Sequence, residues 1–304
     1  MRIVLTGQAA FGAQVLEALL NGGDEVVGVF TGQQPGPSGP LKEVAEKWGL
    51  PLFQPARMKD PEVYEQFHGL NADLGVLAFV TDIVPGSVLR CPRLGSIQYH
   101  PSLLPRHRGA SAMHWAVING DARTGLTVFW ADEGIDTGNI LLQKEADLGP
   151  DDTMGTLYFN KLFPLGVEAM AEAVLLVARG KAPSIAQDHS QATYEPPCGE
   201  EHARVDWYRP MAQVYNLIRG TNPQPGAFTT LRGEKLKLFD AASRPGGSAR
   251  DRPGEVTAVD EEGFTVTCPG GAIMMKRVQP AGAAKMAAGQ WAQETGLKIG
   301  ERLE

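Results

Sequence analysis

The stretch RIVLTGQAAFGAQVLEALLNGGDEVVGVFT, residues 2–31, decides the fold class. It begins with an apolar, β-branched run that stops at Gly7, which is typical of a buried strand. A helical pattern follows and places Val15, Leu16 and Leu19 on one face, and residues 25–31 then form a second apolar run. Strand, helix and strand in this order predict parallel pairing with right-handed crossovers, and therefore an α/β fold.

The same alternation continues through the first half of the chain. Helical or strand-like patterns predict helices over 60–70 and 110–119 and strands over 73–80, 95–100 and 126–131. A long helical pattern over 151–181 contains Pro164, which should kink or split the helix. Little periodicity remains in residues 182–204, which we interpret as a linker.

From Val205 onward the pattern changes to short alternating runs. A helix over 211–219 precedes several strand-like segments separated by Gly and Pro turns, near residues 235–240, 254–260, 264–268 and 272–278. Such runs indicate a small β-barrel. A short helix and a closing turn are expected within 286–303, and loops over 32–40 and 243–253. We therefore expect two domains, residues 1–203 and 204–304.

Composition excludes several classes of protein. The formal net charge of −7 gives no general attraction for a nucleic-acid backbone. The three cysteines, Cys91, Cys198 and Cys268, form neither a disulfide framework nor a zinc-binding pattern, which favours a reducing compartment. No signal peptide or membrane-spanning run is present, so we expect a cytoplasmic protein with no membrane partner.

The common cofactor and nucleophile motifs are absent. The turn from Gly7 to Gly12 lacks the G-x-G-x-x-G spacing of dinucleotide-binding loops, and the chain has no P-loop. His100, His107 and His114 lack the spacing of zinc ligands, so no metal is expected. No G-x-S-x-G motif marks a nucleophilic serine. Acid–base and oxyanion chemistry remains.

Two stretches could supply that chemistry. The predicted strand 95–100 ends at His100, and Gln98 lies two residues before it and so on the same face. The predicted strand 126–131 leads into a loop that contains Asp136. From the residues alone, His100 could be a structural histidine and Asp136 a turn-capping aspartate. If the two strand ends are neighbours, one crevice holds both side chains.

The motifs themselves resemble those of a known family. The stretches His100-Pro-Ser-Leu-Leu-Pro105 with Arg108-Gly-Ala110, and Asp132-x-Gly134-x-Asp136-Thr-Gly138, resemble the signature of the folate-dependent formyltransferases, which include methionyl-tRNA formyltransferase. Further stretches are similar to the N-terminal hydrolase domain of 10-formyltetrahydrofolate dehydrogenase, at residues 99–112, 129–138, 162–164, 180–183, 192–195 and 218–220. The resemblance implies an enzyme of one-carbon metabolism. It also implies a Rossmann-like formyltransferase domain with a mostly parallel sheet, followed by an OB-like β-barrel.

The resemblance implies a donor and a set of site residues. The donor is 10-formyltetrahydrofolate, and the catalytic residues are His100, Asp136 and the residue at the family's asparagine position, here Gln98. The hydrolase domain of the dehydrogenase has an aliphatic residue there, so Gln98 departs from both subgroups. Its extra methylene could move a hydrogen-bond donor by about 1 Å and cost roughly a hundredfold in rate. The implied folate-binding residues are Phe79, Thr81, Asp82, Ile83, Ala131, Asp132, Glu133 and Gly134.

The acceptor of the formyl group stays open at this stage. Water would make the chain a hydrolase, and a small amine would make it a transferase. The acidic net charge argues against aminoacyl-tRNA, although Arg106, Arg108 and the arginines of residues 244–252 keep that acceptor in consideration. Because of Gln98, a catalytically weak folate-binding protein is a further alternative.

Overall fold

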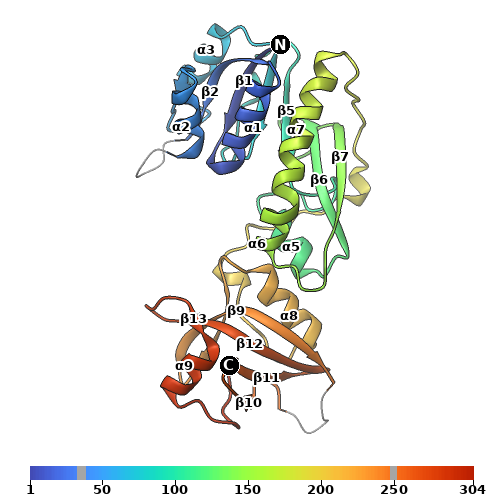
Figure 1. Cartoon of the computed structure of the whole chain (residues 1–304). Helices are drawn as coiled ribbons and strands as arrows, with labels where there is room; N and C mark the ends of the chain where they lie inside the picture. Colours follow the sequence, from blue (N-terminus) through green and yellow to red (C-terminus); the bar gives the residue numbers. More distant parts are fainter. Residues whose placement is uncertain (33–38, 247–251) are drawn as a thin grey trace. The chain divides into compact units, whose positions relative to one another are not determined.

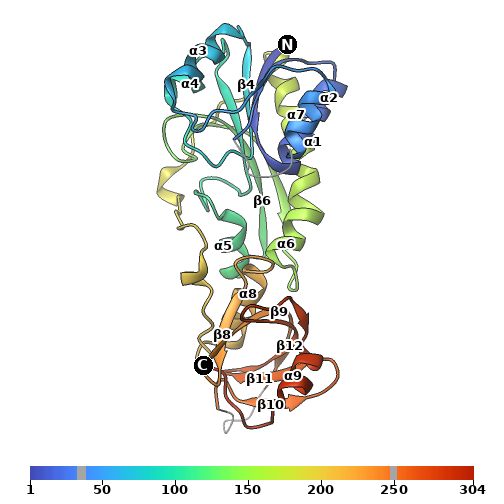
Figure 2. The same cartoon turned by 90° about the vertical axis from the view of Figure 1, so that its left-hand side faces the viewer.

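The structure is a computed structural model that describes residues 1–32, 39–246 and 252–304. Residues 33–38 and 247–251 of the predicted loops over 32–40 and 243–253 lie outside the described residues, whereas residues 243–245 belong to a strand and not to the predicted loop. The chain divides into two compact units, each discontinuous in sequence (Figures 1 and 2). The first contains residues 1–110, 124–146 and 159–195, and the second contains residues 111–123, 147–158 and 196–304. The expected domain division at residues 203 and 204 stays a prediction.

A seven-stranded sheet forms the centre of the first unit, in the order β3-β2-β1-β4-β5-β6-β7. β1 pairs in parallel with β2 and β4, and β4 pairs in parallel with β5, whereas β5 and β6 are antiparallel. The parallel strands therefore end at one common edge of the sheet. The strands are β1 (Arg2–Gly7), β2 (Glu25–Phe30), β3 (Leu52–Phe53), β4 (Leu74–Ala78), β5 (Ser96–His100), β6 (Arg123–Trp130) and β7 (Ile140–Asp147).

Helices cover the sheet and set the direction of the β5 side chains. Ile97 and Tyr99 are buried in the same core cluster as residues of α1 and α7, so Gln98 and His100 point to the opposite face. The predicted split at Pro164 is confirmed: α6 ends, a π-helix (Tyr158–Leu162) follows, and Pro164 lies in the first turn of α7. The helices of this unit are α1 (Ala9–Asn21), α2 (Pro40–Lys47), α3 (Pro61–Gly69), α4 (Gly86–Leu89) and α7 (Phe163–Ala178), whereas α6 (Met154–Leu157) belongs to the second unit.

The second unit is built on an antiparallel sheet of six strands. Its core contains Trp207, Phe264 and Trp291, and the indole N–H of Trp207 donates to the Thr229 hydroxyl at 3.0 Å. The elements are α5 (Ala112–Ile118), α8 (Met211–Gly220), α9 (Ala288–Thr295), β8 (Ala227–Leu231), β9 (Glu234–Pro245), β10 (Val256–Val259), β11 (Phe264–Cys268), β12 (Gly271–Pro280) and β13 (Met286–Ala287). A mostly parallel Rossmann-like sheet and a separate antiparallel sheet confirm the predicted fold class. Within the described ranges, no helix has the length and apolar character needed to span a membrane.

Candidate active site

His100 lies at the carboxyl end of β5 and is 5% exposed. Its Nε2 atom is 2.7 Å from the backbone oxygen of His107, and its Nδ1 atom is 3.4 Å from Oδ2 of Asp136. The same carboxylate oxygen accepts the Gly109 N–H at 2.8 Å. The structure therefore brings His100 and Asp136 together, with residues 107–109 in contact with both.

Each of the two segments that form this pair contains a residue with a strained backbone. His107 and Asp136 have φ angles of 55° and 54°, in the left-handed region that residues other than glycine rarely adopt. Each such residue costs about 1–3 kcal/mol and persists only where its surroundings fix it. Gly109 has a φ angle of 101°, which glycine accepts without a Cβ clash. The left-handed turns aim the His107 carbonyl at His100 and the Gly109 N–H at Asp136.

Gln98 is half-buried on the face of β5 that also carries His100. Its backbone is held between Leu77 of β4 and Phe129 of β6. The side-chain amide has no hydrogen-bond partner among the described residues. The amide is therefore available to a substrate, whereas both nitrogens of His100 already face oxygen atoms.

The first segment of predicted folate-binding residues follows β4. The Thr81 hydroxyl accepts from the Gln8 side chain at 3.2 Å. The carboxylate of Asp82 accepts the backbone N–H groups of Met58 (2.7 Å) and Ile83 (2.8 Å), so it stabilises the turn. The Ile83 side chain is 76% exposed and offers an apolar surface at the sheet edge. Phe79 has a φ angle of 62° and packs against the core.

The second predicted segment follows β6 and contacts residues that follow the first segment in the chain. Asp132 accepts the Gly134 N–H at 3.1 Å and the Thr137 hydroxyl at 2.7 Å, which makes it a turn residue. Glu133 pairs with Arg90 at 2.6 Å, and a Cβ atom on Gly86 would lie 2.3 Å from its carboxylate. Ala131 is fixed by a backbone hydrogen bond to Ser96 at 2.8 Å. The second predicted segment therefore contacts helix α4, which begins three residues after Ile83.

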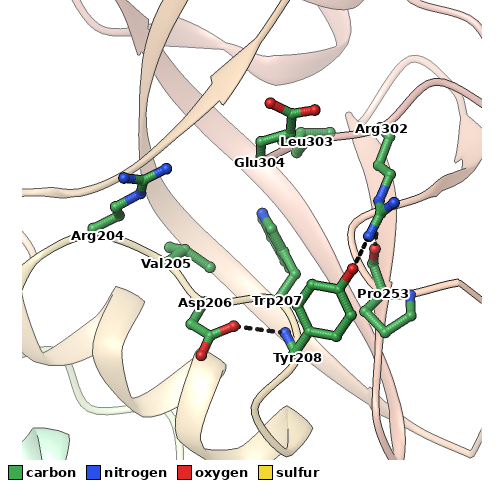
Figure 3. A pocket seen from close by; sticks show the side chains of 9 residues that line it. All are labelled: Arg204, Val205, Asp206, Trp207, Tyr208, Pro253, Arg302, Leu303 and Glu304. Carbon is green, nitrogen blue, oxygen red and sulfur yellow. Dashed lines mark hydrogen bonds between the residues drawn. The ribbon is translucent and has the colours of Figure 1, made fainter.

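A cavity of about 450 Å³ in the second unit contains none of the predicted site residues (Figure 3). In that cavity Arg302 lies over the Tyr208 ring, 5.5 Å from its centroid, and donates to the Tyr208 hydroxyl. Asp206 accepts the Tyr208 N–H at 3.0 Å. These polar groups bind one another and leave no reactive pair among the described residues that line the cavity, so it is a weaker candidate than the site at His100.

A cavity of about 320 Å³ lies at the carboxyl ends of β1, β2 and β4 in the first unit. Phe79, Thr81 and Asp82 line it, together with Gln8, which precedes α1 and gives the first turn of that helix no side-chain cap. The Arg57 side chain also lines it and has no partner among the residues that the structure describes. A helix N-terminus and an arginine favour a polar or anionic group. In parallel α/β proteins, ligands bind at this edge of the sheet.

The sequence did not indicate the residues that support the pair from behind. Residues 182–204 were interpreted as a linker, yet Gln187 donates to the backbone oxygens of Asp136 (2.9 Å) and Gly138 (2.7 Å). The Glu195 carboxylate lies 3.0 Å from Nδ1 of His107. The quoted resemblance over residues 192–195 was the one signal for this region. Across the described ranges, no group of three His, Cys, Asp or Glu side chains could hold a metal ion.

Comparisons with known proteins show which family the chain resembles. The chain matches the family described as formyl transferase over residues 1–174, and the formyl transferase C-terminal domain over residues 198–296. It is 46% identical over 257 residues to cytosolic 10-formyltetrahydrofolate dehydrogenase from Xenopus laevis, covering 83% of this chain and 28% of that protein. The chain thus spans less than a third of the dehydrogenases that it matches. It is 40% identical to methionyl-tRNA formyltransferase from Symbiobacterium thermophilum, over 100% of this chain and 95% of that protein.

Solved structures share the fold at low sequence identity. HypX from Aquifex aeolicus, in complex with tetrahydrofolic acid, has a TM-score of 0.70 at 20% identity, over 99% of this chain and 48% of HypX. WlaRD, a sugar 3N-formyl transferase, has a TM-score of 0.70 at 15% identity, over 93% of this chain and 99% of WlaRD. The two family matches and the sequence identity to the dehydrogenase and to the methionyl-tRNA formyltransferase confirm the predicted resemblance. The chain therefore belongs to the formyl transferase family.

Proposed function

We propose that this protein takes the formyl group of 10-formyltetrahydrofolate, transfers it to water or to an amine, and releases tetrahydrofolate. The observation that carries the proposal is the His100–Asp136 pair at the carboxyl edge of the sheet in a member of the formyl transferase family. The names of the related dehydrogenases supply the donor. Transfer to water yields formate, and transfer to an amine yields a formamide.

In this mechanism the acceptor attacks the formyl carbon and an oxyanion develops on the formyl oxygen. A ring N–H of His100 stabilises that charge, and the Gln98 amide, which has no partner in the described chain, supplies a second donor. Because Nε2 faces the His107 carbonyl and Nδ1 faces Asp136, the ring reaches the formyl oxygen by exchanging one of these partners. Asp136 orients His100 and helps to pass the proton of the acceptor towards the folate nitrogen.

In this proposal the pterin of the donor binds to the two segments on either side of α4 in the chain, residues 79–83 and 131–134. Backbone groups of residues 79–83 and 131–134 are the proposed contacts, and the exposed side chains of Ile83 and Ile135 offer apolar surface for the ring. Among the named residues, the carboxylate of Asp82 and that of Asp132 are already engaged in turns. We therefore propose that these two carboxylates shape the loops and do not bind the ligand themselves.

The acceptor distinguishes the candidate functions. Water or a small amine is the first candidate, supported by the identity to the dehydrogenases and by the acidic net charge of −7, which disfavours a polyanion. Methionyl-tRNA is the second candidate, favoured by the match to a methionyl-tRNA formyltransferase along the whole chain. A catalytically weak folate-binding protein is the non-enzymatic alternative, motivated by Gln98. A cytoplasmic location stays a proposal that rests on three unpaired cysteines.

Incubation with 10-formyltetrahydrofolate tests these alternatives directly. The release of tetrahydrofolate is followed by absorbance, first with no added amine, then with a panel of small amines, and finally with methionyl-tRNA. Rapid release without an amine identifies a hydrolase, and release that depends on one addition identifies the acceptor. Stoichiometric folate binding without release under all three conditions would contradict catalysis and support the binding protein.

A further inference from the structure

Arg108 is a buried cation that has no carboxylate partner. It is 2% exposed, and among the described residues no carboxylate lies within ion-pair distance of its guanidinium group. Nη1 donates to the Tyr194 hydroxyl at 2.6 Å, and Nη2 lies 3.0 Å from Nδ1 of His189. Burying an arginine without a counter-ion costs free energy, and the hydrogen bonds of the guanidinium group must offset that cost.

The remaining donors of Arg108 converge on one amide. Nε and Nη2 donate to Oε1 of Gln187 at 3.2 and 2.6 Å. The Nε2 group of Gln187, which is 5% exposed, donates in turn to the backbone oxygens of Asp136 and Gly138 at 2.9 and 2.7 Å. Every polar group of this buried side chain is therefore used, and all of its contacts join Arg108 to the loop that carries Asp136.

These contacts link the two strained segments of the site. Arg108 stands between His107, whose carbonyl binds His100, and Gly109, whose N–H binds Asp136. Gln187 fixes the carbonyl of Asp136 itself, a residue in the left-handed region. A rotation of either segment would change the distance between His100 and Asp136. The Gln187 amide binds Arg108 on one side and the Asp136 and Gly138 carbonyls on the other, so it joins the two segments.

We propose that Gln187 and Arg108 are positioning residues of the reaction centre, which set the geometry of the His100–Asp136 pair without touching the substrate. This inference rests on the proposed function. Because Gln187 binds the Asp136 loop and not the substrate, we expect its replacement to lower the rate of the chemical step and to leave donor binding nearly unchanged. A misplacement of about 1 Å in a reacting group can lower a rate by roughly a hundredfold.

Two variants of Gln187 and one matched control test the proposal. Gln187→Met removes all of the hydrogen bonds at similar volume. Gln187→Glu keeps the shape and the acceptor for Arg108 but cannot donate to the Asp136 and Gly138 carbonyls when ionised. The control is Ser184→Ala, which removes a 3.0 Å hydrogen bond from Asn139 that joins the same two chain segments. If Gln187 only tethers these segments, the control should resemble the Gln187 variants.

We expect kcat to fall about 10- to 100-fold in both Gln187 variants, with KM for 10-formyltetrahydrofolate changed less than about twofold. The control should keep the wild-type kcat. A second readout needs no substrate: the imidazole signals of His100 in ¹⁵N-edited NMR spectra of the folded proteins should move in the Gln187 variants and stay in place in the control. Circular dichroism checks that each variant is folded.

Unchanged kcat in a folded Gln187 variant, or His100 signals at their wild-type positions, would overturn the proposal. An equal loss of kcat in Ser184→Ala would also overturn it, because a general tether would then explain the effect. A wild-type protein that releases no tetrahydrofolate would instead contradict the proposed function. In that case the NMR comparison still decides whether Gln187 positions His100.

Discussion

At His100 the two ring nitrogens face different oxygen atoms, one from a backbone carbonyl and one from Asp136. If this ring stabilises the oxyanion, His100→Asn should lower kcat for formyl transfer by about 10²- to 10³-fold. His68→Asn is the matched control, because His68 is an exposed histidine on α3. Both rates are measured by tetrahydrofolate release with the acceptor in excess. A His100→Asn enzyme of wild-type rate would exclude the ring from the reaction.

Gln98 is the residue at which this chain departs from its family pattern. Its free amide should donate to the oxyanion, so Gln98→Leu should lower kcat by about 10²-fold. Gln98→Asn should raise kcat, because the shorter side chain returns the amide to the family's position. Rates with water and with an amine are compared for all three proteins. Equal activity of Gln98→Leu and the wild type would show that the amide takes no part.

At the residue scale, the sequence predicted His100 and Asp136, which the structure brings together, but not the residues that hold them. His100 and Asp136 belong to motifs of consecutive residues, which can be recognised without a structure. Gln187 lies 51 residues from Asp136 and contacts only a backbone oxygen there. A bond to a backbone atom leaves no pattern of residue types at its acceptor, so the linker interpretation of residues 182–204 concealed this role.

Among the elements, the junction between β6 and β7 contains a glycine that leaves no room for a Cβ atom. A Cβ atom on Gly138 would lie 1.7 Å from the backbone oxygen of Trp130. Gly138→Ala should therefore force the loop apart and lower the free energy of unfolding by about 1–3 kcal/mol. Urea denaturation measures this change. Gly69→Ala is the control, because nothing lies within 4 Å of a Cβ atom there. A Gly138→Ala protein as stable as the wild type would contradict the clash.

The strands that the sequence predicted and those that it missed differ in their place in the sheet. β1, β2, β4, β5 and β6 are inner strands, and most of their residues are buried. β7 lies at the edge and alternates between half-buried and exposed positions along ILLQKEAD. An edge strand faces solvent on one side, so its polar residues resemble those of a loop. β3 has two residues, too few for any periodic pattern.

For the whole molecule, thiol reactivity offers a measure of folding. Burial raises the pKa of Cys198 and of Cys268 to about 11, and it also raises the pKa of Cys91. Because the thiolate is the reactive form, all three should react slowly with a disulfide reagent at pH 8 in the native protein and quickly in urea. Native reactivity should rise as the pH approaches 11. Fast labelling of all three thiols at pH 8 without urea would contradict the burial.

The same pKa values have a consequence for stability. An unfolded thiol ionises near its ordinary pKa of 9.0, whereas the folded thiols stay protonated until about 11. The unfolded chain therefore binds fewer protons between these values, and the free energy of unfolding should fall as the pH rises above 9. Thermal unfolding of the wild type at pH 8 and pH 10 measures the fall. Replacing Cys198 and Cys268 with alanine should reduce the difference between the two melting temperatures.

The second unit is assembled from three separate stretches of chain, so its first stretch is synthesised well before the last one. Helix α5 ends at Ile118 and contacts α8, which begins at Met211. A ribosome adding roughly 5–20 residues per second makes the intervening chain in about 5–20 seconds. During that time the buried face of α5 has no partner from α8 on the nascent chain. During synthesis the apolar face of α5 is therefore exposed until α8 has been made. A chaperone bound to residues 112–118 would cover that face and prevent aggregation.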